Sequence, residues 1–273
     1  MSVSRAALRQ AVAARMMRTV VGVAGGGSTV ALADPDQLQD AGASDDLWTG
    51  AWLHITAGAN AGEVRRVTVY DPASGSVTVN RPFAQPVDGT AEYELLRLLS
   101  PAELHQAIDD TLARCWHRTL ADLTSAADDQ RQFPLPEWVN RRQQVVEVWE
   151  RRGASPRGEH LRAVDWWRLT RRPVASPSPF WLEVGHAPGG RLVVEALRPY
   201  EALPTDQSNT DAPADWVVAG ALAHAYRRLR RDAPAADVDR YAALQREAAH
   251  EFQRLSRLYQ PRAVRRVQLG ERL

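Results

Sequence analysis

Alternating valines in the stretch 48–96 constrain the fold of this chain more than any other feature. Val67 and Val69 alternate with polar or aromatic residues in one run, and Val77 and Val79 alternate with polar residues in a second run. Such a period of two is typical of half-buried strands. The segment 71–75, Asp-Pro-Ala-Ser-Gly, separates the runs and has the composition of a hairpin turn. With flanking strands at 52–56 and 92–96, the stretch predicts at least four antiparallel strands in a small sheet or barrel.

A second β-rich region follows at 133–200. Apolar residues recur with period two in several short segments, which Gly/Pro/Ser-rich loops at 152–158 and 175–179 separate. The predicted strands lie at 146–149, 164–170, 180–184 and 192–197. Their pattern and spacing predict a β-sandwich-like unit with tryptophans in its core and on its faces.

Four segments have the apolar spacing of helices. The first covers 4–17, the second begins at the capping box Ser100-Pro-Ala-Glu103 and extends to about 126, the third follows Thr210-Asp-Ala-Pro213, and the last lies between Pro234 and Pro261.

These elements predict an α+β fold with a helical bundle as its body. We expect the body to comprise 1–20, 100–130 and 205–260. Two antiparallel β units, a small sheet or barrel at 28–98 and the sandwich-like unit at 133–200, are then insertions, and 261–273 forms an extended C-terminal arm.

Composition narrows the class of protein. The formal net charge of +1 gives no general electrostatic attraction to nucleic acid, and the sequence of 273 residues contains no lysine. No apolar run approaches the roughly 20 residues that a membrane-spanning helix needs. Cys115 is the single cysteine, so no internal disulfide can form, which fits a reducing cytoplasm or a particle assembled there.

No local motif predicts catalysis. The segment 22–29 has the spacing of a phosphate-binding loop, but Ser28 occupies the lysine position, so a hinge is the better interpretation. The seven histidines show no metal-ligand spacing, and Cys115 falls on an apolar helix face. We therefore expect no catalytic, cofactor-binding or metal site and no enzymatic activity.

Two features favour a protein interface. Trp166 and Trp167 are adjacent, so in a strand one of them points away from the core. The arm after Pro261 carries apolar residues among arginines without a partner helix. Its candidate contact residues are Arg262, Val264, Arg265, Arg266, Val267, Leu269 and Leu273. A local core residue and a frayed tail are the alternatives.

Several runs resemble structural proteins of tailed bacteriophages and prophages. The runs Trp48-Thr-Gly-Ala-Trp-Leu, Ala61-Gly-Glu-Val-Arg-Arg-Val, Val77-Thr-Val and Pro82-Phe83 are similar to a β module common in these proteins. Leu197-Arg-Pro-Tyr-Glu-Ala-Leu, Thr210-Asp-Ala-Pro-Ala-Asp-Trp and Ala221-Leu-Ala-His-Ala-Tyr-Arg-Arg-Leu resemble the closing part of head-to-tail adaptor, or connector, proteins of the neck.

The resemblance implies a non-enzymatic virion protein without cofactors. Such adaptors form homo-oligomeric rings, often twelve-fold, beneath the portal protein, and they contact tail or neck proteins while DNA passes through without specific binding. The helices would pack around the ring, and 262–273 would contact the portal or the next subunit. No membrane is involved. Another tail component, such as a tail terminator, baseplate or receptor-binding part, is the first alternative, and a hydrolase is the second.

Overall fold

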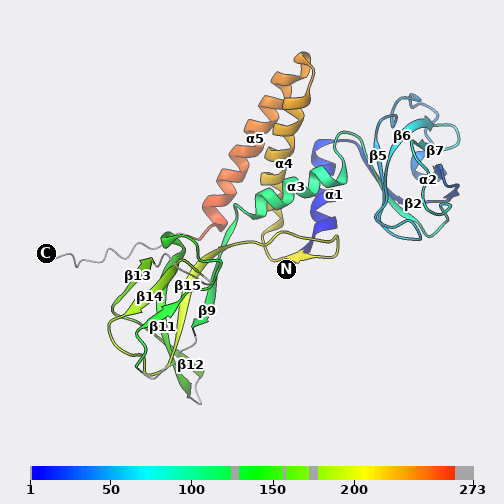
Figure 1. The fold of residues 1–273 in the computed structure, drawn as a ribbon. Helices are drawn as coiled ribbons and strands as arrows, with labels where there is room; N and C mark the ends of the chain where they lie inside the picture. Colours follow the sequence, from blue (N-terminus) through cyan, green and yellow to red (C-terminus); the bar gives the residue numbers. More distant parts are fainter. Residues whose placement is uncertain (1, 124–128, 156–157, 172–177, 262–273) are drawn as a thin grey trace. The chain divides into compact units, whose positions relative to one another are not determined.

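The computed structural model describes residues 2–123, 129–155, 158–171 and 178–261 (Figure 1). The described chain divides into two compact units. The first comprises Met1–Leu112 and Glu201–Arg257, and the second comprises Ala113–Tyr200 with 258–261. The second unit is therefore inserted in the sequence of the first.

The first unit contains a seven-stranded antiparallel sheet in the order β2-β8-β5-β6-β7-β4-β3. Its strands are β2 (Thr19–Val23), β3 (Gly26–Gly27), β4 (Ala31–Ala33), β5 (Trp52–Ile55), β6 (Val64–Asp71), β7 (Ser76–Val79) and β8 (Glu92–Leu96). The strands predicted at 52–56 and 92–96 are confirmed as β5 and β8. The predicted hairpin is also confirmed, because β6 pairs with β7 and Gly75 in the turn has a φ of 63°.

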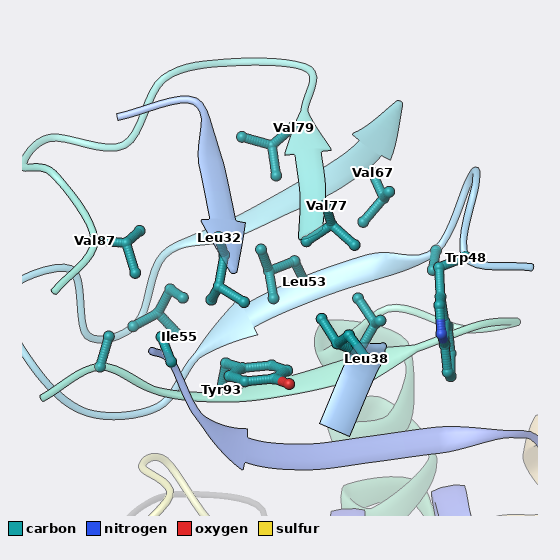
Figure 2. Close-up of a cluster of buried hydrophobic side chains, with 14 of the residues drawn as sticks. Leu32, Leu38, Trp48, Leu53, Ile55, Val67, Val77, Val79, Val87 and Tyr93 are labelled. Carbon is teal, nitrogen blue, oxygen red and sulfur yellow. The ribbon is translucent and has the colours of Figure 1, made fainter. Parts of the chain in front are cut away.

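The two edge strands of this sheet, β2 and β3, follow each other in the sequence. Between them, Ala24 N donates to Ala91 O at 2.9 Å and Gly25 N donates to Ala33 O at 2.8 Å. Because one stretch of backbone pairs with both ends of the sheet, the sheet curls toward a closed barrel. The curl surrounds one hydrophobic core (Figure 2). Its fully buried members include Leu32, Leu53, Ile55, Val77, Tyr93 and Leu95.

Helices form the rest of the first unit. The helices α1 (Arg5–Met16), α3 (Pro101–Leu112) and α4 (Ala214–Asp232) pack on one another, and α5 (Ala235–Tyr259) runs beside α4 (Figure 1). Three short elements complete the unit: α2 (Pro35–Leu38), and β1 (Val3–Ser4) paired with β16 (Asn209–Thr210). The predicted capping box is confirmed, because Ser100 N donates to Glu103 Oε2 at 2.7 Å and Glu103 N donates to Ser100 Oγ at 3.3 Å.

Contacts between α4 and α5 centre on Trp216. Its indole Nε1 donates to Ser256 Oγ at 2.9 Å, and its ring stacks on Phe252 with 6.2 Å between centroids. Gly220 lies in the same layer, where a Cβ would clash with Thr111 and Phe252. A glycine at this position therefore lets α3, α4 and α5 approach closely.

The second unit consists of two antiparallel sheets that share one core. A four-stranded sheet has the order β12-β11-β15-β9, and a three-stranded sheet has the order β10-β14-β13. The elements are β9 (Trp116–Leu123), β10 (Gln132–Pro134), the 3₁₀ turn η1 (Arg142–Gln144), β11 (Val145–Ser155), β12 (Gly158–Ala163), β13 (Trp167–Arg171), β14 (Phe180–Val184) and β15 (Arg191–Pro199). Val148 and Val194 from one sheet and Phe133 and Leu182 from the other belong to a single hydrophobic cluster.

The predicted α+β fold, a helical bundle with two small β insertions, is wrong. In the described residues the protein is a mixed α/β structure with five α-helices and four antiparallel sheets, of which the seven-stranded sheet is the largest. Periodicity identifies single strands but not which strands pair. It therefore underestimated a sheet in which strand β2 pairs with the distant strand β8.

Two local predictions are also wrong. The helix expected from Ser100 to about 126 ends at Leu112, and Trp116–Leu123 is strand β9, paired along its length with β15. Its tertiary pairing overrides an apolar spacing that also fitted a helix. Half of the hinge expected at 22–29 is strand, because Gly22 and Val23 pair with β8 and Gly26 and Gly27 pair with β4.

Candidate functional site

The most unusual side chain in the first unit is Arg9 of α1, which has no solvent-exposed surface. A fully buried arginine is rare unless its charge and donors are paired. Its Nε donates to Glu94 Oε2 at 2.7 Å and its Nη2 donates to Glu94 Oε1 at 2.9 Å. Nη1 donates to Asp206 Oδ2 at 2.7 Å and contacts His105 Nε2 at 2.6 Å. Since arginine only donates, His105 Nε2 must accept this bond and carry no proton.

Neighbouring groups complete the buried cluster. Arg5 Nε donates to Asp206 Oδ1 at 3.1 Å, and Arg5 Nη1 donates to the carbonyl of Leu203 at 2.7 Å. His54 Nδ1 lies 3.7 Å from Glu94 Oε2, beyond hydrogen-bonding distance. Two arginines thus face two carboxylates. We call Arg5, Arg9, His54, Glu94, His105 and Asp206 the Arg9 cluster.

Electrostatics keep the cluster in one protonation state at neutral pH. Burial favours the neutral form of Glu94, but His54 and Arg9 beside it outweigh burial and lower the pKa of Glu94 to about 2. Burial, together with the charges of Arg5 and Arg9, lowers the pKa of His105 to about 4. Glu94 is therefore ionised and His105 is neutral, which matches the direction of the hydrogen bond from Arg9.

The cluster joins four separate segments of the first unit. Arg5 and Arg9 belong to α1, Glu94 belongs to β8, His105 belongs to α3, and Asp206 precedes β16. An open pocket of about 480 Å³ lies beside it, lined among others by Arg5, His54, His105, Thr205 and Asp206. The polar groups next to this pocket are largely engaged with each other. The geometry is that of a clamp that fixes the helices to the sheet.

A second hollow lies among α1, α4 and α5. It has a volume of about 260 Å³. Its floor is apolar, and charged groups stand at its rim. The lining residues are Arg15 from α1, Ala219, Leu222 and Tyr226 from α4, and Leu244, Glu247, Ala248 and Glu251 from α5. We call it the helix groove.

No family model matches this sequence, and neither does any curated protein.

Neither Trp166 nor Trp167 belongs to the Arg9 cluster or lines the helix groove. Trp166 is 46% exposed in the second unit, with the Arg168 guanidinium 5.7 Å from its ring centroid. Trp167, in contrast, packs against the core of that unit. The arm residues Arg262, Val264, Arg265, Arg266, Val267, Leu269 and Leu273 lie outside the described residues.

Other features of the sequence have structural places. Cys115 is buried, and burial raises the pKa of its thiol to about 12, so the thiol is a poor nucleophile. In the described ranges, His, Cys, Asp and Glu side chains do not gather into a metal-binding group. Every helix in those ranges is too short or too polar to cross a membrane.

Sequence reasoning missed the Arg9 cluster entirely. Its members are separated by up to 201 positions and form no spaced motif. The one available signal was Arg9 itself, which lies between the apolar Leu8 and Val12 on the buried side of an amphipathic helix.

Proposed function

We propose that this chain is a structural virion protein, a head-to-tail adaptor that forms a ring between the portal and the tail of a tailed bacteriophage or prophage particle. The proposal joins the sequence resemblance to one observation, the open helix groove. An adaptor needs surfaces that bind copies of itself and neighbouring proteins, and a groove on long helices is one such surface.

The composition of the helix groove supports an interface role. Leu222, Tyr226 and Leu244 provide an apolar centre, while Glu247 and Glu251 provide a charged rim. Protein interfaces combine a desolvated apolar centre with a polar periphery in this way. The formal net charge of +1 also suits a channel wall past which DNA slides without specific binding.

A hydrolase is the competing candidate, because two histidines, His54 and His105, and the carboxylate of Asp206 line the pocket beside the Arg9 cluster. The geometry favours a structural role there. The lone pair on His105 Nε2 is occupied by Arg9, and a pKa of about 4 makes this imidazole a weak base. Asp206 is bound to Arg5 and Arg9, so it is a hydrogen-bond acceptor for arginine rather than an orienting group for a histidine base.

Imaging of the purified full-length chain, alone and with the portal protein from the same genome, tests the proposal. We expect closed rings that bind one end of the portal, and twelve-fold symmetry matches the adaptors that the sequence resembles. A protein that stays monomeric at high concentration and does not bind the portal would overturn the proposal. Three-fold or six-fold rings that bind tail proteins instead would indicate a tail terminator or baseplate component.

A further inference from the structure

Small residues on α4 and α5 create the helix groove. Its floor includes the small residues Ala219 and Ala248, both buried, so the backbones of α4 and α5 leave a hollow between larger side chains. Leu222 and Tyr226 border the hollow on α4, and Leu244 borders it on α5. Leu244 remains partly exposed, as expected for an apolar residue that faces an unfilled space.

Three charged side chains line the groove, two carboxylates and one guanidinium. Glu247 and Glu251 stand on the α5 side, and Arg15 stands on the α1 side. The Arg254 guanidinium binds Glu251 through two contacts of 2.7 Å and lowers its pKa, so this carboxylate is ionised at neutral pH. Glu247 is exposed and faces solvent. Because Arg254 already pairs with Glu251, Glu247 is the carboxylate that an occupant with apolar and basic side chains would meet in this groove.

The C-terminal arm, residues 262–273, has that composition. It carries four arginines and one acidic residue, with valine and leucine among them. The basic residues are Arg262, Arg265, Arg266 and Arg272, and the apolar ones include Val264, Val267 and Leu269. The arm directly follows Pro261, and α5 ends two residues earlier, at Tyr259. It is therefore joined to the same helix that forms one wall of the groove.

We propose that the C-terminal arm of one copy occupies the helix groove of a second copy. Twelve residues span at most about 40 Å when extended, and a helix of 25 residues is about 37 Å long, so the arm can reach along a neighbouring α5. A groove and an arm on each copy make a contact between unlike surfaces, and repetition of such a contact closes into a ring. This inference rests on the ring assembly proposed above.

Disulfide formation between two introduced cysteines tests whether the arm of another copy occupies the groove. One tagged chain carries Leu244→Cys and a second, differently tagged chain carries Leu269→Cys, and the two are mixed and oxidised. We expect a covalent dimer that contains both tags. The native Cys115 is buried and does not compete. Asp239→Cys, at an exposed α5 position outside the groove lining, is the matched control and is expected to lose the product.

The same two cysteines within one chain test whether the arm occupies the groove of its own chain. If Leu244→Cys and Leu269→Cys in one chain give only an internal bond, while mixed chains give no dimer, the arm occupies its own groove and the inference is overturned. Failure of both reactions overturns it as well.

A charge exchange gives a second, independent test. Glu247→Arg should weaken subunit association about fivefold, the effect of one surface ion pair, and Arg265→Glu with Arg266→Glu in the partner should restore it. Asp239→Arg should leave association unchanged. Sedimentation measures each case. If Glu247→Arg and Asp239→Arg weakened subunit association equally, a specific contact between Glu247 and the arm would be contradicted.

Truncation after Pro261 separates this inference from the proposed function. Loss of rings in the truncated chain supports the arm contact. Intact rings in the truncated chain overturn the arm contact while leaving the adaptor proposal in place. Absence of rings and of portal binding in the full-length chain overturns the adaptor proposal itself.

Discussion

The Arg9 guanidinium donates two hydrogen bonds to the Glu94 carboxylate across 85 positions of sequence, and both side chains are excluded from solvent. This pair connects the first helix to β8, the strand next to the edge strand β2 of the seven-stranded sheet. Its burial means that each charge depends on the other, because neither can be hydrated when its partner is removed.

Arg9→Met should therefore be strongly destabilising. We expect a loss of about 3 to 5 kcal/mol in the free energy of unfolding, because Glu94 is left buried with an uncompensated charge. Urea denaturation followed by circular dichroism measures the loss. Arg97→Met, at an exposed position, is the control and should change stability by less than about 0.5 kcal/mol.

The double substitution Arg9→Met with Glu94→Met should restore much of that loss. Two apolar side chains of similar size need no hydration, so the desolvation cost disappears with the ion pair. A double variant that is less stable than Arg9→Met would show that Glu94 is satisfied without Arg9, by Gln10, whose Nε2 donates to Glu94 Oε1 at 2.8 Å.

Stability should fall as the pH drops from about 6.5 to about 4. Burial and the charges of Arg5 and Arg9 lower the pKa of His105 to about 4, so in this window the unfolded chain binds a proton that the folded protein does not. The full shift corresponds to about 3 kcal/mol, present above the unfolded pKa and lost as the pH falls toward the folded pKa.

His105→Gln tests the origin of this pH dependence. The glutamine amide oxygen can accept the hydrogen bond from Arg9, but it does not titrate. The slope of unfolding free energy against pH should therefore flatten between pH 6.5 and 4. Below about pH 4.5 both proteins should still lose stability, because Glu94 has a folded pKa of about 2. An unchanged slope above pH 4.5 would assign the effect to another histidine.

Gly75→Ala should disrupt the β6–β7 hairpin. Gly75 has a φ of 63°, and an added Cβ would lie 2.8 Å from Gln39 N and 2.9 Å from Pro35 Cα. We expect a loss of about 2 to 4 kcal/mol, which combines left-handed backbone strain with backbone crowding. Thermal or urea unfolding measures it.

Gly62→Ala is the matched control for this hairpin variant. Gly62 also has a positive φ, 87°, but an added Cβ there meets nothing within 4 Å. It should therefore cost only the backbone strain, about 1 to 2 kcal/mol. Equal losses at the two glycines would show that crowding around Gly75 relaxes without cost.

Cys115 should react slowly with thiol reagents in the folded protein. Burial raises the pKa of its thiol to about 12, so little thiolate exists at neutral pH. Labelling with a chromogenic disulfide should require unfolding, and its rate should rise sharply in denaturing urea. Rapid labelling of the native protein would contradict the buried position.

Local signals predicted local structure well in this chain. The valine alternation located the β6–β7 hairpin, and Ser100 with Glu103 located the start of α3. The pairing of strands that are distant in the sequence could not be predicted from local patterns. Trp116 to Leu123 has an apolar spacing compatible with a helix, and only pairing with the distant strand β15, from Leu192 to Pro199, makes it a strand.

The Arg9 cluster was beyond sequence reasoning for the same reason. Arginine, glutamate and histidine at unrelated positions are ordinary surface residues until the fold brings them together. Arg9 differs from other arginines of α1 only in lying on the buried face of that helix. The pairing of the chain, rather than any short motif, determines which charges must be neutralised inside.

Asp206 and β16 belong to the first unit but follow the inserted residues Ala113–Tyr200 in the sequence, which affects when the first unit can fold during synthesis. Residues 1–112 leave the ribosome first, yet the last acceptor for Arg9 and the strand that pairs with Val3–Ser4 follow only after Ala113–Tyr200 has been made. Until residue 206 is synthesised, Arg9 Nη1 lacks its Asp206 acceptor and the first unit cannot complete its fold. Translation that stalls between residues 200 and 206 leaves a first unit that lacks Asp206, β16 and the helices α4 and α5.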